Sequence, residues 1–105
     1  MALNVITGSF TATGVSPSFS PLGSYPPAPP RDFNVSIWGS FTGSIQLERS
    51  FDNGSTWLPI TAAGTQLYIW TAPASEVAEE PEQGPIYRLH CTAQSGGTAN
   101  YRISQ

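Results

Sequence analysis

The sequence predicts an all-β protein, either an antiparallel sandwich or a small barrel of roughly six to eight strands, with a proline-rich N-terminal segment. Apolar and polar residues alternate over several short stretches, which is the period of a half-buried strand. Turn-forming residues separate these stretches, with 10 Gly and 10 Pro among 105 residues. Helical periodicity is hard to find, so strands and turns account for most of the chain.

The clearest strands lie in the middle of the chain. Residues 32–41 alternate strictly between apolar and polar side chains, and residues 44–51 do the same. A tight turn at residues 42–43 is expected to join these two stretches as a hairpin.

Further strands are expected toward the C-terminus. They form two more hairpins, residues 56–61 with 66–71 around a turn at 62–65, and residues 86–92 with 99–104 around a turn at 94–97. Residues 74–83 are the best helix candidate, with at most one or two turns before Pro81. In chain order, these segments predict a meander of hairpins.

The first third of the chain differs in kind, and we divide the sequence into residues 1–32 and an antiparallel β domain at 33–105. Residues 5–13 can form a strand, and six prolines follow between positions 17 and 30. Such a tract favours extended polyproline conformation. It is either a surface crossover of the same sandwich or an arm that packs on a neighbouring subunit. The arm interpretation predicts that deleting residues 1–30 leaves a folded domain with weakened assembly. It also makes three apolar residues candidate contacts: Phe19, Leu22 and Tyr25.

Charge and cysteine content exclude several classes of function. The four basic residues are dispersed arginines, so binding of nucleic acid through its phosphates is not expected. No stretch approaches the roughly 18 consecutive apolar residues of a membrane span. Cys91 is the only cysteine, which excludes an intramolecular disulfide and a cysteine-based zinc site. The N-terminus lacks the basic and apolar regions of a signal peptide, so synthesis in a cytoplasm is expected.

No group of residues forms a catalytic or metal-binding pattern. His90 and Cys91 are neighbours on an expected strand, so they point to opposite faces and cannot form a catalytic dyad. The glutamates between positions 76 and 82 do not have the spacing of a calcium loop. We therefore expect a protein that is not an enzyme and that needs no cofactor or metal.

One motif has a defined local structure. Residues 50–57, Ser-Phe-Asp-Asn-Gly-Ser-Thr-Trp, match the Asp-box pattern S-x-D-x-G-x-T-W at every defined position. The Asp52 carboxylate can accept backbone N–H groups of its own loop, and Gly54 can adopt a positive φ. The structural residues of this hairpin turn are Ser50, Asp52, Gly54, Thr56 and Trp57. A sialidase propeller repeats the motif in several blades, and one copy in 105 residues predicts only a structural turn.

Exposed aromatic residues are candidates for an interaction surface. If Leu67 and Ile69 face the core, then Tyr68 and Trp70 face outward, and the converse assignment exposes the two aliphatic residues. Trp38 falls on the polar face of its strand. Large rings among small polar residues are typical of protein interfaces and of flat carbohydrate-binding faces.

The segments 33–41 and 45–57, followed by 87–89 and 101–104, resemble small β-rich virion structural proteins of tailed bacteriophages and prophages. The resemblance covers roughly residues 33–105. It implies a capsid decoration or cement protein, present in the virion, whose partners are the major capsid protein and copies of itself. Two alternatives remain: a tail or head–tail connector component, and a small carbohydrate-binding module that binds a glycan.

Overall fold

The computed structural model describes residues 4–21, 31–80 and 84–105, and these residues form β-strands without a helix. The strands are β1 (Val5–Phe10), β2 (Gly14–Val15), β3 (Arg31–Trp38), β4 (Phe41–Ser50), β5 (Leu58–Pro59), β6 (Thr61–Ala62), β7 (Thr65–Gln66), β8 (Ile69–Trp70), β9 (Ala74–Glu80), β10 (Ile86–Gly97) and β11 (Ala99–Ser104).

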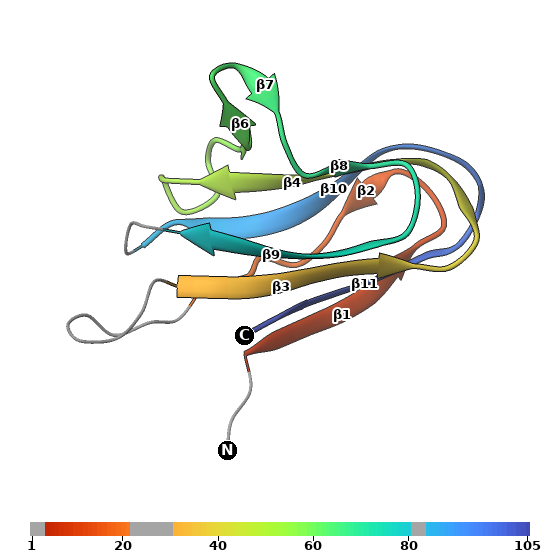
Figure 1. Ribbon diagram of the computed structural model, residues 1–105, viewed down its shortest axis with the longest axis horizontal. Coiled ribbons are helices and arrows are strands. Elements are labelled where there is room, and N and C mark those ends of the chain that lie inside the picture. Colours follow the sequence, from red (N-terminus) through yellow and green to blue (C-terminus); the bar gives the residue numbers. More distant parts are fainter. Residues whose placement is uncertain (1–3, 22–30, 81–83) are drawn as a thin grey trace.

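Two antiparallel sheets pack face to face (Figure 1). Sheet A has the strand order β1-β11-β3-β9. Sheet B has the order β2-β10-β4-β5, and β8 also pairs with β4. The short hairpin of β6 and β7 stands out from the sandwich on the side of sheet B (Figure 1). The all-β antiparallel sandwich expected from the sequence is confirmed.

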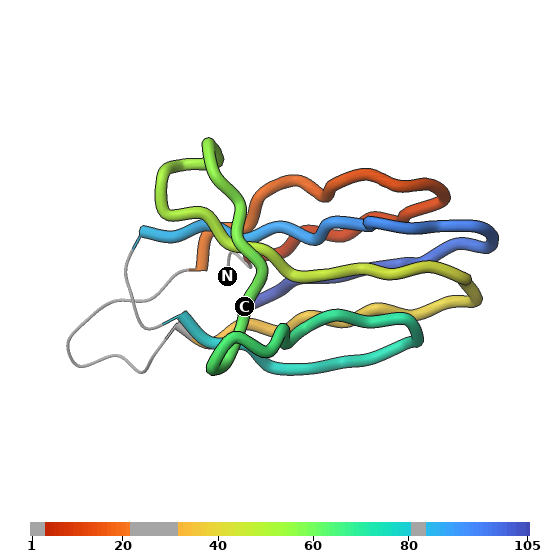
Figure 2. Tube along the Cα trace, turned by 90° about the horizontal axis from the view of Figure 1, so that it is seen from above, coloured from red at the N-terminus to blue at the C-terminus, as the bar shows by residue number. Residues whose placement is uncertain are grey.

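The chain follows one long hairpin that is rolled up. Its first half runs antiparallel to its second half, so that β1 pairs with β11, β2 with β10, β3 with β9 and β4 with β8. Rolling brings β11 against β3 and β10 against β4, which completes both sheets. These pairings are the strand order of a jelly roll. Viewed from above, β1 and β2 lie at one side of the sandwich and β8 and β9 at the other (Figure 2).

The core lies between the two sheets and follows the alternation of the strands. The buried apolar residues of the long strands alternate with outward-facing ones, which satisfies the period-2 pattern of a sheet with one covered face: Phe33, Val35 and Ile37 in β3, Ile45 and Leu47 in β4, Tyr87, Leu89 and Cys91 in β10, and Ala99, Tyr101 and Ile103 in β11. The largest fully buried side chains include Tyr87, Phe19, Phe33, Ile37, Ile45, Leu47, Leu89 and Ile103. The rings of Phe19, Phe33 and Tyr87 pack in sequence, with centroids 5.4 and 4.7 Å apart.

Two of the predicted hairpins are wrong. β3 and β4 are consecutive but lie in different sheets, and the chain crosses between them at residues 39–40 instead of turning at 42–43. β10 and β11 are separated in the same way at Thr98. Alternation gives each strand an apolar face, but two strands that face each other across the core have the same pattern as two strands that pair. The predicted meander is therefore replaced by arches that join the sheets.

Residues 74–83 are not helical where the structure describes them. Residues 74–80 form β9, which pairs with β3 from Ile37 opposite Ala74 to Arg31 opposite Glu80. The glutamates of this segment have a high helix propensity. In the structure, however, Ala78 and Glu80 are buried and the residues between and before them are exposed, as in a strand. Pairing with β3 overrides the local preference.

The two strands predicted at 56–61 and 66–71 are each divided into shorter pieces. Tyr68 has a positive φ of 52° and separates β7 from β8. The predicted turn at 62–65 is present as the β6–β7 turn, where Ala63 and Gly64 have φ values of 51° and 83°.

The N-terminal segment belongs to the sandwich as far as residue 21. β1 pairs along its length with β11, β2 pairs with β10, and Phe19 forms a bridge with Tyr87. The arm interpretation is therefore wrong for residues 4–21, which include Phe19. Leu22 and Tyr25 lie outside the described residues.

Candidate interaction site on the outer face of sheet B

The turn after β4 is held by hydrogen bonds that converge on Ser50. Its buried hydroxyl accepts the Gly54 N–H at 2.8 Å and donates to Asp52 Oδ1 at 2.7 Å. The same carboxylate oxygen accepts the Thr56 N–H at 2.7 Å. Gly54 has a φ of 98°, which a residue without a Cβ adopts at little cost. The Asp52 bond and the φ of Gly54 are those expected of the Asp-box pattern, whereas the bonds to Ser50 were not predicted. Together these bonds connect β4 to β5.

Removing this turn's central hydroxyl is expected to destabilise the protein. Ser50→Ala leaves the Gly54 N–H and the Asp52 carboxylate without their shared partner, which costs about 1–3 kcal/mol of unfolding free energy. Asp52→Ala is expected to lower stability less, because Asp52 is exposed. Urea unfolding measures both, with exposed Ser55→Ala as the matched control. Equal stability of Ser50→Ala and Ser55→Ala contradicts the role given to Ser50.

The Asp-box turn also delivers an aromatic ring to the outer face of sheet B. Trp57 lies against the guanidinium of Arg88, whose Cζ is 4.4 Å from the ring centroid. Arg88 belongs to β10 and alternates with the buried Tyr87 and Leu89, so it points away from the core. A cation over an indole ring in this geometry is attractive. Trp57 and Arg88 thus join the turn to the neighbouring strand.

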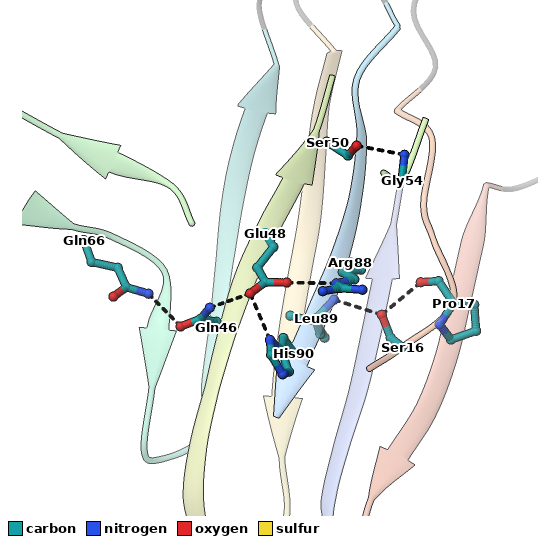
Figure 3. A network of polar contacts seen from close by, with 10 residues as sticks. All are labelled: Ser16, Pro17, Gln46, Glu48, Ser50, Gly54, Gln66, Arg88, Leu89 and His90. Atoms are coloured by element: carbon teal, nitrogen blue, oxygen red, sulfur yellow. Dashed lines mark hydrogen bonds and ion pairs between the residues drawn. The ribbon is translucent and has the colours of Figure 1, made fainter. Parts of the chain in front are cut away.

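A buried carboxylate lies beside this pair. Glu48 is opposite Arg88 in the register of β4 and β10, and it is only 5% exposed although its strand position faces outward. Its Oε1 accepts the Arg88 Nε–H at 2.8 Å. Its Oε2 lies 2.9 Å from His90 Nδ1 and accepts from Gln46 Nε2 at 2.5 Å (Figure 3). Burial alone would raise the pKa of Glu48, but the hydrogen bonds from His90, Arg88 and Gln46 outweigh it and lower the pKa.

The network continues across the sheet. Gln66 of β7 donates to Gln46 Oε1 at 3.0 Å, so the protruding hairpin is tied to β4 (Figure 3). Gln46 itself stands in a cross-strand row with Val15, His90 and Ile69. Val15 and Ile69, at the two ends of this row, are 50% and 46% exposed. The outer face of sheet B therefore combines a fixed ionic centre with exposed aliphatic ends and one indole ring.

Acid is expected to remove the stabilisation that Glu48 supplies. Its pKa is lower in the folded protein than the ordinary value of 4.5, so its contribution is complete above that value and is lost as the pH falls through the folded-state pKa. Glu48→Gln is expected to cost about 2 kcal/mol at pH 7, because a charged acceptor becomes neutral. Urea unfolding from pH 7 down to about pH 3 should show the difference from wild type shrinking with acidity. A constant difference contradicts this account.

A second buried carboxylate connects the two sheets. Glu80 of β9 is 1% exposed, and its Oε1 accepts from the Tyr87 hydroxyl at 2.6 Å and from Arg49 NH1 at 3.1 Å. Burial, together with the hydrogen bond to Glu80, raises the pKa of Tyr87. This cluster lies inside the sandwich and holds β9 against β4 and β10.

The candidate interface residues do not share one face. Trp70 is in the core and Tyr68 is half-buried against it, so the assignment that exposes Leu67 and Ile69 is the one found. Trp38 is 48% exposed, but on the outer face of sheet A. Trp70 is therefore no interface residue, because β8 pairs with β4 in the register that places Trp70 opposite the buried Ile45.

Sequence reasoning missed the Glu48 network. The charged and ring partners of Glu48, Arg88 and His90, lie about 40 positions further along the chain, and only the neutral Gln46 is close in sequence. The sequence did show Glu48 on the polar face of one expected strand, and Arg88 and His90 at alternate positions of another. Only the antiparallel register of β4 and β10 brings them together.

The titratable groups near this surface are engaged or buried. Both oxygens of Glu48 are engaged by fixed donors, and burial raises the pKa of the Cys91 thiol, which disfavours the reactive thiolate. Among the described residues, no group of three or more His, Cys, Asp or Glu is placed to hold a metal ion. That part of the chain also has no helix long and apolar enough to cross a membrane.

The fold and the site together define a jelly-roll domain with a candidate interaction surface on sheet B. Comparisons of the chain with protein-family models, with curated proteins and with solved structures find no match.

Proposed function

We propose that this chain is a non-enzymatic structural protein of a tailed-phage virion, a head decoration or cement protein that binds the major capsid protein. The observation that carries the proposal is the jelly-roll strand order, an architecture that viral capsid proteins use. It adds to the resemblance of residues 33–105 to phage virion proteins. One fold supports many functions, so the side chains on the outer face of sheet B supply the specific contacts.

The outer face of sheet B is the surface we assign to capsid binding. Trp57 and Arg88 are of the types enriched in the centres of protein interfaces, and Ile69 and Val15 add exposed apolar area. The outer face of sheet A also exposes Trp38 and Val77, but they lie on different strands among small hydroxyl and amide side chains, without the continuous cross-strand row that Val15, His90, Gln46 and Ile69 form on sheet B. A subunit that binds only the assembled shell stabilises that state by mass action.

The test uses particles of the phage or prophage whose genome encodes this chain, assembled without it. Purified protein is added back, and bound protein and the temperature of particle disruption are measured. We expect wild type to bind and to raise this temperature, and Ile69→Lys to do neither. Val77→Lys, which places the same charge on the exposed outer face of sheet A, is the matched control and is expected to bind. Failure of wild type to bind would overturn the proposal.

The alternative function, a carbohydrate-binding module, depends on Trp38, Tyr68 and Trp70 lining a single open face. Trp70 is buried, Tyr68 is half-buried and Trp38 belongs to the other sheet, so this platform is not formed. The observation that would have favoured glycan binding is therefore absent from the described residues.

A further inference from the structure

An open strand edge runs along one side of sheet A. β1 pairs with β11 from Val5 opposite Ser104 to Phe10 opposite Ala99. Within residues 4–21, 31–80 and 84–105, no strand pairs with the other side of β1, which lies at the side of the sandwich (Figure 2). An edge strand presents backbone N–H and C=O groups with which a further strand can pair.

The register shows which backbone groups face this edge. Gln105 N–H donates to the Asn4 carbonyl at 2.9 Å, so residues 4 and 105 are a hydrogen-bonded pair of the antiparallel ladder. Bonded and non-bonded pairs alternate along such a ladder. The even-numbered residues of β1 therefore bond to β11. Three residues turn their backbone N–H and C=O groups to the open edge: Val5, Thr7 and Ser9.

The two edges of sheet A differ in how they are protected. β1 reads Val-Ile-Thr-Gly-Ser-Phe and contains neither a charged residue nor proline, the usual devices that prevent edge-to-edge pairing. The opposite edge strand, β9, carries Glu76, Glu79 and Glu80. Two copies that met through β9 would bring carboxylates together, whereas two copies that met through β1 would not.

We propose that β1 pairs with β1 of a second copy of this chain, antiparallel and about a two-fold axis, so that the two sheets A form one continuous sheet. Centred on Thr7, this register places Thr7 opposite its own counterpart and Val5 opposite Ser9 of the other copy. All outward-facing backbone groups of β1 are then used, in roughly six hydrogen bonds between the chains.

A second copy fits this edge because the pairing is self-complementary. Opposed residues lie on the same face of the joined sheet, and uncharged cross-strand pairs such as Thr with Thr are favourable. Among the described residues, the like charges closest to this junction are the two copies of Arg102, whose strand β11 adjoins β1. Three strand spacings separate them, about 14 Å, which exceeds the screening length of about 8 Å in physiological salt. Two-fold dimers are also the commonest oligomers.

This inference does not depend on the proposed function, since it concerns association of the purified chain. Light scattering coupled to size exclusion gives the mass of wild type, which we expect to be a dimer at about 100 μM, a concentration suited to a micromolar dissociation constant. Thr7→Pro removes an N–H that faces the open edge and no bond to β11. We expect it to be a monomer that still unfolds cooperatively.

Thr7→Lys serves as the second variant, and it decides the matter if Thr7→Pro does not fold. It opposes two ammonium groups at the two-fold axis and is expected to be monomeric, whereas Val77→Lys puts the same charge on β9 and should remain dimeric. A monomeric wild type overturns the proposal, and so does a dimeric Thr7→Lys.

Cross-linking tests the register directly. A short bis-maleimide is expected to join two chains of Thr7→Cys but not of Val77→Cys, and the native Cys91 is fully buried. Equal cross-linking of the two variants would contradict pairing through β1.

Discussion

Deletion of residues 1–30 is expected to abolish the cooperative unfolding transition of this protein. The deletion removes β1, β2 and Phe19, and so takes one strand from the side of each sheet. Without β1, the backbone edge of β11 has no partner strand. The core residue Tyr101 also loses the ring of Phe10, whose centroid lies 5.0 Å from its own. Thermal unfolding followed by near-ultraviolet circular dichroism measures the effect.

A point substitution separates this effect from a general cost of truncation. Phe19 is 1% exposed and its ring packs against Phe33, so Phe19→Ala is expected to cost about 3–5 kcal/mol. Val15→Ala, at an exposed position of the same segment, is the matched control and should cost little. A truncated protein that melts cooperatively near the wild-type temperature would restore the interpretation of this segment as an arm.

Glu80→Ala is expected to cost about 3 kcal/mol of unfolding free energy, because it takes the acceptor from the buried Tyr87 hydroxyl and from the half-buried Arg49 guanidinium. The Tyr87 hydroxyl and the Arg49 guanidinium both bond to Glu80 Oε1, and these three residues connect β9, β10 and β4. Glu80→Gln keeps an acceptor in place and is expected to lose less.

The neighbouring Glu79→Ala is the control, because Glu79 is on the same strand but exposed. Chemical denaturation at neutral pH compares the three variants. If Glu80→Ala and Glu79→Ala have the same stability, the buried cluster does not hold the two sheets together.

The local part of the fold could be predicted from the sequence. The alternation of residues 32–41 and 44–51 identified β3 and β4, because a strand with one covered face has a period of two residues. What the pattern could not identify was the partner of each strand. β3 pairs with β11, more than 60 positions away, and nothing in either strand alone distinguishes that arrangement from a hairpin with β4.

The candidate site also has a part that could be predicted locally and a part that depends on distant strands. The turn that contains Asp52 and Gly54 is specified within eight consecutive residues, so the Asp52 bond to the Thr56 N–H and the positive φ of Gly54 could be predicted from the motif. The burial of Glu48 depends on Arg88 and His90 in a distant strand, and the burial of Trp70 depends on the register of β8. Long-range pairing, rather than local preference, decides both.

The number of copies of this chain in a purified particle tests the proposed function most directly. Quantitative mass spectrometry gives the ratio of this chain to the major capsid protein. A decoration protein predicts a ratio near that of the shell subunits, with hundreds of copies in each head. A count of about six or twelve, the symmetry of tail and connector rings, would contradict decoration of the shell, as would the absence of the chain from the particle.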